Sequence, residues 1–353
     1  MRCQGQGARL LSADVRFGLI GYGLWGRHHA AAISAAPGAS LAAIACASEK
    51  TAAAASGDFP GVPVEIGYEA LLARADVDAV AVVVPNHLHA DVGVAALEAG
   101  KDVLLEKPMA NTLEGCDRLL AAARQSKRVL TIGHEMRLSQ QYGRVKALID
   151  AGDIGVPRHL AFTLFRFPFR PGSGGWRYDP ARVGSWILEE PVHFFDFAMW
   201  CFERVGDPLS VLALGDAAQG GAGMPRSFTA VLRFPGDAHA VITQTLGGFE
   251  YHQNLHVVGA EGSIRSWWSG ALDRTLTPTF ELRVERRGAG AVESIPVAHS
   301  GELVELRVQA AKVVTAFTER HPVVSGEEAR KRIAVCLAAE QSLRENREIA
   351  LRL

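Results

Sequence analysis

The sequence has few cysteines, and they form no recognisable pattern. Their number is odd, and no two have the Cys-x-x-Cys spacing: Cys3, Cys46, Cys116, Cys201 and Cys336. The close pairs of a metal or redox centre and the dense spacing of a disulfide-stabilised secreted domain are both lacking. We expect reduced thiols, no metal ion and a cytoplasmic location.

The sequence also lacks an excess of one charge and any long hydrophobic run. The 37 Lys and Arg residues nearly balance the 38 Asp and Glu residues, so no strong field exists to hold nucleic acid or an anionic membrane. The longest apolar run, 79–85, is only strand-sized, whereas a membrane span needs about 18 residues or more. The expected partners are a small molecule and further copies of the chain.

The first half of the chain predicts a Rossmann-like domain over 15–134. Residues 1–14 contain no apolar stretch of the kind that a signal peptide needs, and we interpret them as an N-terminal extension. After them, short apolar runs alternate with alanine- and leucine-rich helical stretches, as in a doubly wound parallel sheet. The runs are apolar at successive positions, which is typical of strands buried on both faces: 15–20, 41–46, 78–84, 102–105 and 129–133.

The second half predicts a mostly antiparallel sheet flanked by helices, so the fold class is α/β plus α+β. Several segments alternate between apolar and polar residues, which indicates one packed face: 158–166, 228–234, 238–246, 255–259 and 280–286. We assign 135–326 to a substrate-binding and oligomerisation domain. Residues 327–353 form a C-terminal helix and tail that we expect to pack near the N-terminal domain.

A Gly-x-Gly-x-x-Gly motif follows the first predicted strand and opens a helix. It consists of Gly21, Tyr22, Gly23, Leu24, Trp25 and Gly26. The first glycine allows a tight turn, the second lets the backbone approach a pyrophosphate, and the third lets helix and strand pack closely. The motif in this position predicts binding of NAD or NADP.

The end of the second predicted strand bears on the choice between these cofactors. NAD-selective domains usually carry a carboxylate there that accepts hydrogen bonds from the ribose, but this chain has Cys46. Ser48 and Lys50 follow and suit a 2′-phosphate, which favours NADP. In the alternative interpretation Lys50 is a solvated surface residue and Glu49 accepts the ribose hydroxyls.

Two further segments lie at the carboxyl ends of predicted strands, where open α/β sheets bind ligands. In the first, Pro85 and Asn86 precede His89; Asn86 either caps the next helix or contacts the cofactor, and His89 faces the nicotinamide side. In the second, Glu106 and Lys107, both candidates for cofactor contact, precede Pro108, which keeps the backbone at Lys107 extended. Lys107 should therefore project toward the cofactor crevice.

These segments together resemble the glucose-fructose oxidoreductase, inositol dehydrogenase and rhizopine catabolism (Gfo/Idh/MocA) family. The resemblance implies that Lys107 binds the reacting substrate hydroxyl and assists proton transfer. The segment 184–196 is similar to a second family block, in which Glu189 matches the family's aspartate and His193 its catalytic histidine. The alternative for His193 is a hydrogen-bonded histidine of the core.

On one helix, Glu189 and His193 would stand at i and i+4 and share a face, so a carboxylate could orient the imidazole. Pro191 and Ser185 depart from the family pattern, however, and leave the assignment open between Glu189 and Glu190.

For the substrate, Trp176 and Arg177 resemble a Trp-Arg pair that floors or clamps a polyol in many members of the family. Arg137 and Glu190 are further candidates for substrate contact, and a solvated surface arginine is the alternative for Arg137.

We therefore expect an NAD(P)-dependent oxidoreductase that acts on a hydroxyl or keto carbon of a sugar, cyclitol or related compound. Two alternatives within the same fold are a redox-assisted glycosidase, which restores its NAD in each cycle, and a dinucleotide-binding regulator without catalysis. The resemblance also implies a homodimer or homotetramer formed through the antiparallel sheet, with Trp267 and Trp268 as candidate contacts.

Overall fold

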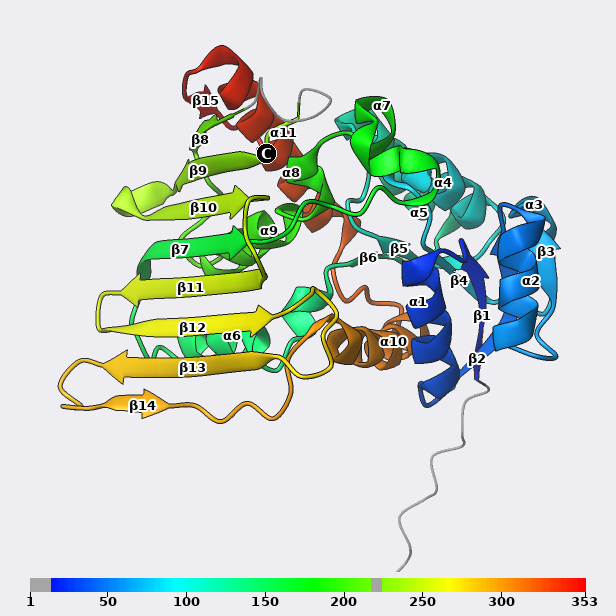
Figure 1. Ribbon diagram of the computed structural model, residues 1–353, viewed down its shortest axis with the longest axis horizontal. Helices are drawn as coiled ribbons and strands as arrows, with labels where there is room; N and C mark the ends of the chain where they lie inside the picture. The colour runs from blue at the N-terminus through cyan, green and yellow to red at the C-terminus, as the bar shows by residue number, and fades with distance from the viewer. Residues whose placement is uncertain (1–13, 217–223) are drawn as a thin grey trace, which may run out of the picture.

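The computed structural model describes residues 14–216 and 224–353, and it contains two sheets that lie side by side (Figure 1). The predicted N-terminal extension lies outside the described residues except for Asp14. Within the described ranges, no helix is both long enough and apolar enough to cross a membrane.

Sheet A is the predicted doubly wound parallel sheet. Its six strands lie in the order β3-β2-β1-β4-β5-β6, and every pair is parallel. The chain reverses its direction of winding between β1 and β4, which places the ligand crevice beyond their carboxyl ends. The strand bounds are β1 Val15–Ile20, β2 Ala39–Cys46, β3 Val64–Ile66, β4 Ala79–Val82, β5 Asp102–Glu106 and β6 Leu130–Gly133.

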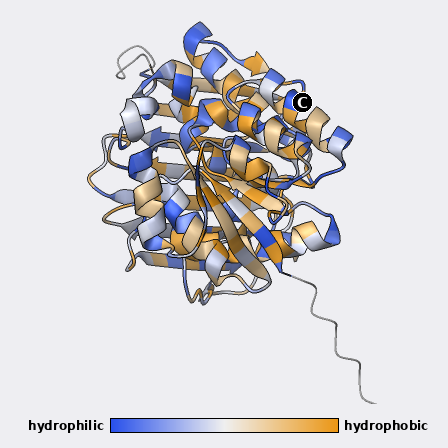
Figure 2. Cartoon of the chain, turned by 90° about the vertical axis from the view of Figure 1, so that its right-hand side faces the viewer, coloured by the Kyte–Doolittle hydropathy of each residue, from blue (hydrophilic) through white to orange (hydrophobic). Residues whose placement is uncertain are grey.

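Helices cover both faces of sheet A, and one of them comes from the far end of the chain. Figure 2 shows the molecule from the right-hand side of Figure 1, where sheet A lies. The strands in this view are mostly hydrophobic, and the helices around them carry both hydrophobic and hydrophilic residues. Helix α10 packs against α1, and Phe317 of α10 contacts Phe17 of β1, with ring centroids 5.8 Å apart. The helices of this half are α1 Leu24–Ala35, α2 Glu49–Asp58, α3 Glu69–Leu72, η1 Asn86–Leu88, α4 His89–Glu98 and α5 Leu113–Ser126.

Sheet B is the predicted, mostly antiparallel sheet. Its nine strands lie in the order β14-β13-β12-β11-β7-β10-β9-β8-β15, and only the β7–β10 pair is parallel. Buried and more exposed residues alternate along β9 and β10, so one face is packed. The bounds are β7 Pro157–Phe165, β8 Ser210–Gly215, β9 Ser227–Arg233, β10 His239–Thr245, β11 Tyr251–Gly259, β12 Gly262–Gly270, β13 Thr279–Arg286, β14 Val292–Ser294 and β15 Ile349–Ala350.

Helix α9 packs on sheet B against β7 and β10, and Phe194 stacks on Phe162 with ring centroids 4.3 Å apart. This contact fixes the helix that carries His193. The remaining helices are η2 Glu135–Leu138, α6 Tyr142–Asp150, η3 Ser173–Tyr178, α7 Pro180–Val183, α8 Trp186–Glu189, α9 Val192–Cys201, η5 Pro235–Asp237, α10 Glu302–Glu319 and α11 Gly326–Glu345.

One of the two tryptophans expected at a subunit interface points the other way. Trp268 is 3% exposed, and its indole nitrogen lies 3.4 Å from the Ser300 carbonyl oxygen inside the fold. Successive residues of a strand face opposite sides of the sheet, so only Trp267 remains for such a contact. The expectation of a homodimer or homotetramer stays a prediction.

Buried ion pairs centred on Asp196 of α9 connect α11 to η2, the segment that precedes α6. Asp196, 1% exposed, lies between Arg137 at 2.6 Å and Arg332 at 2.9 Å, and Arg137 also pairs with Glu328 at 3.0 Å. Burial alone would raise the pKa of Asp196, but the two guanidinium groups outweigh it and hold that pKa far below its usual range.

We predict that Asp196→Asn lowers the free energy of unfolding by about 3 to 5 kcal/mol, because it leaves two buried guanidinium groups without a full counter-charge. Urea denaturation followed by circular dichroism measures this change. The matched control is Asp91→Asn, which breaks a pair with Arg118 whose side chains are both more than half exposed, at a cost below about 1 kcal/mol. Equal losses in the two variants would contradict the prediction.

Candidate active site

The glycine loop between β1 and α1 has the geometry that a dinucleotide pyrophosphate needs. Gly21 has a φ of +100°, and a Cβ there would lie 2.2 Å from the carbonyl oxygen of Val83. A Cβ on Gly26 would lie 2.0 Å from the Gly21 carbonyl oxygen, whereas one on Gly23 meets no atom within 4 Å. Gly23 also begins α1 without a side-chain cap, which leaves its first N–H groups free for an anion. The loop therefore fits the cofactor.

The other residues of the loop can offer the cofactor little beyond their backbone. The hydroxyl of Tyr22 donates to Asp58 at 2.7 Å, and its ring is buried. The ring of Trp25 lies under the guanidinium of Arg274 at 4.7 Å, while Leu24 is half-exposed. The predicted role of this motif thus belongs mainly to its glycines.

The residues expected to face the adenosine ribose lie at the end of β2 and the start of α2. Cys46 is buried at the last position of β2. Ser48 caps α2, because its hydroxyl accepts a hydrogen bond from the Thr51 amide at 3.3 Å. Glu49 and Lys50 are both exposed in the first turn, so both interpretations of the cofactor preference remain compatible with the geometry.

The segment after β4 contacts the second domain through Asn86. Asn86 is 4% exposed, and its side-chain amide donates to the Val183 carbonyl and to Glu189, both at 3.1 Å. Of the two interpretations of Asn86, capping does not occur, since the first turn here has no side-chain cap. The ring of His89 is buried, with its nitrogens 2.9 Å from the Val84 carbonyl oxygen and 2.6 Å from the Pro108 carbonyl oxygen; that it faces the nicotinamide stays a prediction. Pro85 is half-buried beside them.

The segment after β5 reaches the second domain. Nε2 of His29 lies 2.7 Å from the carboxylate of Glu106, and both side chains are buried; a contact of Glu106 with the cofactor stays a prediction. Lys107 extends from the same sheet edge, and its ammonium donates to the Glu189 carbonyl oxygen at 2.6 Å. This hydrogen bond joins the Rossmann-like domain to the segment that carries His193.

The expectation that Glu189 and His193 share one helical face is wrong. Helix α8 starts at a cap by Ser185 and ends at Glu189, Glu190 leaves the helical region with a φ of −129°, and α9 begins after Pro191. The break follows from proline, which fits the first turn of a helix but not its interior. The carboxylate of Glu189 instead accepts hydrogen bonds from Asn86 and Arg177.

The carboxyl group beside His193 is that of Glu135, which the sequence reasoning missed. Nε2 of His193 lies 3.5 Å from Oε1 of Glu135, and the ring of His134 stands edge-on to the imidazole at 5.6 Å. Burial, then the positive charge of Lys107, lowers the pKa of His193 well below its usual value. Burial, then the charge of Glu106, raises the pKa of Glu135 well above its usual value. At neutral pH the imidazole of His193 is therefore neutral.

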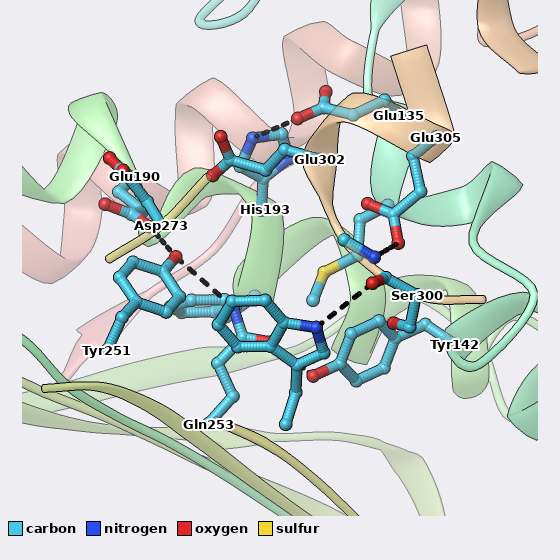
Figure 3. A pocket seen from close by; sticks show the side chains of 14 residues that line it. Glu135, Tyr142, Glu190, His193, Tyr251, Gln253, Asp273, Ser300, Glu302 and Glu305 are labelled. Atoms are coloured by element: carbon cyan, nitrogen blue, oxygen red, sulfur yellow. Dashed lines mark hydrogen bonds and ion pairs between the residues drawn. The ribbon is translucent and has the colours of Figure 1, made fainter. Parts of the chain in front are cut away.

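A cavity opens next to His193, between sheet B and the start of α10 (Figure 3). It encloses about 440 Å³ of space not filled by atoms, part of it open to solvent. Its walls combine acidic and aromatic side chains: Glu135, Met136, Tyr142, Glu190, His193, Phe194, Tyr251, Gln253, Trp268, Asp273, Ser300, Gly301, Glu302 and Glu305. Its polar and aromatic lining next to His193 makes it the candidate substrate site.

Comparison with known proteins identifies the family of this two-domain arrangement. Residues 15–134 match the oxidoreductase family with an NAD-binding Rossmann fold, and residues 142–265 match the GFO/IDH/MocA C-terminal domain. The chain belongs to the Gfo/Idh/MocA oxidoreductase family. This membership confirms the resemblance seen in the sequence.

Relatives of this oxidoreductase include enzymes of sugar and cyclitol chemistry. It is 31% identical to an inositol 2-dehydrogenase of Rhizobium meliloti (strain 1021), over 71% of this chain and 74% of the relative. It is 34% identical to a dTDP-3,4-didehydro-2,6-dideoxy-alpha-D-glucose 3-reductase of Streptomyces violaceoruber, over 82% and 79%. The solved aldose-aldose oxidoreductase from Caulobacter crescentus, complexed with glycerol, shares the fold with a TM-score of 0.82 at 21% identity, over 96% of this chain and all of that one.

The four substrate candidates of this oxidoreductase have different outcomes. Arg137 is held in the ion pairs with Asp196 and Glu328 and is not among the residues that line the cavity. Trp176 is 8% exposed and packs in a cluster with other aromatic residues. The guanidinium of Arg177 lies 4.4 Å from the centre of the Trp176 ring and pairs with Glu189. Neither Trp176 nor Arg177 is among the residues that line the cavity. Glu190 does line it, with its carboxylate bound by Arg166 and the Tyr251 hydroxyl.

Proposed function

We propose that the protein transfers a hydride reversibly between a nicotinamide dinucleotide and the hydroxyl or keto carbon of a sugar, cyclitol or related polyol. One observation carries the proposal: Lys107 of sheet A donates to the Glu189 carbonyl oxygen, and its charge lowers the pKa of His193, which lines the cavity. A dinucleotide bound at the glycine loop supplies the hydride acceptor or donor.

In the oxidation direction, the neutral imidazole of His193 takes the proton of the substrate hydroxyl. A positive charge at Lys107 stabilises the alkoxide that develops as the proton leaves. The carboxyl group of Glu135 lies 3.5 Å from Nε2 of His193 and is the group placed to orient the imidazole. In the reduction direction the same groups return the proton.

We predict that His193→Asn and Lys107→Met each reduce the rate of substrate oxidation by about 10² to 10⁴, because each removes a group that acts on the transferred proton. The dinucleotide dissociation constant should change less than about threefold, since neither group holds the pyrophosphate. Absorbance of the reduced cofactor during a screen of sugars and cyclitols measures turnover, and calorimetry measures the dinucleotide affinity.

The matched controls are His256→Asn and Lys312→Met, which alter exposed residues of the same types. A His193→Asn variant that oxidises the best substrate within about threefold of the wild-type rate would refute the mechanism. Product release without net formation of reduced cofactor would instead support a redox-assisted glycosidase.

We also propose that NADP is bound at least as well as NAD. The support is the neutral Cys46 at the end of β2 and the exposed Lys50 at the N-terminus of α2, which together suit a 2′-phosphate.

We predict that Cys46→Asp shifts the ratio of the two dissociation constants toward NAD by about tenfold, because the new carboxylate repels the 2′-phosphate and accepts the ribose hydroxyls. Cys46→Ala, which adds no charge, is the control. Calorimetry on the wild-type protein tests the proposal directly: an NAD affinity more than about tenfold above that of NADP would contradict it.

A further inference from the structure

The side chains around the cavity are unusually acidic. Five of the fourteen residues that line it carry carboxyl groups, and none of those described is Lys or Arg: Glu135, Glu190, Asp273, Glu302 and Glu305. Charged groups are costly to bury without partners, so each carboxyl group should have a counter-charge, a proton or a ligand.

Three of the five have a counter-charge from outside the cavity. Glu190 pairs with Arg166, and Glu302 with Arg274 at 3.2 Å. Asp273 lies 3.5 Å from Arg170, whose side chain is about half exposed and therefore a weak partner. These pairs explain part of the acidic wall without any ligand.

Glu135 and Glu305 are different, because neither forms an ion pair with Lys or Arg among the residues that the structure describes. Glu135 is 5% exposed, and its Oε2 has no hydrogen-bond partner. Glu305 is 6% exposed and accepts a hydrogen bond from the Gly301 amide at 3.2 Å. Burial, with a smaller contribution from the charge of Glu302, raises the pKa of Glu305 to about 7, and burial and neighbouring carboxylates raise the pKa of Glu135. The wall is therefore short of positive charge.

The groups that face these carboxyls would accommodate a cation. Tyr251 and Trp268 stand edge to face at 5.5 Å and present aromatic surface to the cavity, which attracts cations. In Figure 3, Glu135 and Glu302 lie near the top of the cavity, and Tyr251 and Gln253 lie lower. Within the described ranges, no cluster of His, Cys, Asp or Glu has the arrangement of a metal site.

We infer that the substrate is an amino-substituted polyol, a sugar or cyclitol whose protonated amine binds between Glu135, Glu302 and Glu305. An ammonium group has three donors and no acceptor, and so matches a wall made of carboxyl oxygens. The hydroxyls of the same ring can donate to the remaining oxygens. The inference rests on the proposed function, because it concerns the substrate of the same site.

The test compares matched ligands on the cofactor-saturated protein: D-glucose, D-glucosamine and N-acetyl-D-glucosamine, and inositol with its monoamino analogue. Calorimetry gives the dissociation constants, and reduced-cofactor absorbance gives kcat/KM. We expect the amine of each pair to bind about tenfold or more tightly than the neutral compound, and N-acetylation, which removes the charge, to abolish the advantage.

Glu305→Gln should reduce the ratio of amine to neutral affinity at least about fivefold while changing the affinity for the neutral ligand less. Glu319→Gln, an exposed residue at the end of the same helix, is the control and should leave the ratio unchanged. Equal or weaker binding of the amine in every pair, including no binding of either member, would overturn the inference. Turnover of neutral polyols alone would overturn it and leave the proposed function intact, whereas tight amine binding without turnover would count against the proposed function alone.

Discussion

The hydrogen bond from the Lys107 ammonium to the Glu189 carbonyl oxygen is the contact on which the site depends. It is 2.6 Å long and links the carboxyl edge of sheet A to the end of α8. Each domain alone provides only half of the chemistry, a dinucleotide loop in one and an imidazole beside a cavity in the other. The contact also holds a positive charge close to His193, which lowers the pKa of the imidazole.

Pro191 makes this arrangement possible. Because proline cannot continue a helix, the chain breaks after α8, and the Glu189 carbonyl is free to accept from Lys107 instead of bonding within a helix. The new helix α9 then starts beside Glu135 and is fixed on sheet B by the Phe162–Phe194 contact. A departure from the family pattern thus sets the position of the catalytic candidate.

Much of the fold could be predicted because its signals are local. The glycine loop, the long buried strands and the alternating strands follow directly from residue order, and Lys107 follows a strand whose carboxyl end must face the crevice. The short strands β3, β14 and β15 were missed, since two or three residues at a sheet edge carry too little pattern. The predicted segments also left out the longer strands β8 and β12.

The surroundings of the site depend on tertiary contacts and were less predictable. The partner of His193 was sought four residues away on one helix, but the helix breaks and the partner is Glu135. The rule that placed Lys107 at the sheet edge applies equally to Glu135, which follows β6 in the neighbouring strand position. The acidic cavity could not be predicted, because Asp273, Glu302 and Glu305 come from distant segments that meet only in the fold.

The central claim is that Lys107 and His193, from two domains, serve one proton transfer. A double-mutant cycle with Lys107→Met and His193→Asn measures this most directly, through kcat/KM for oxidation of the best substrate. The account predicts that the double variant loses about as much as the more damaged single variant, because removing either group already disables the shared step. Losses that multiply in the double variant would mean that the two groups act independently, and would contradict the account.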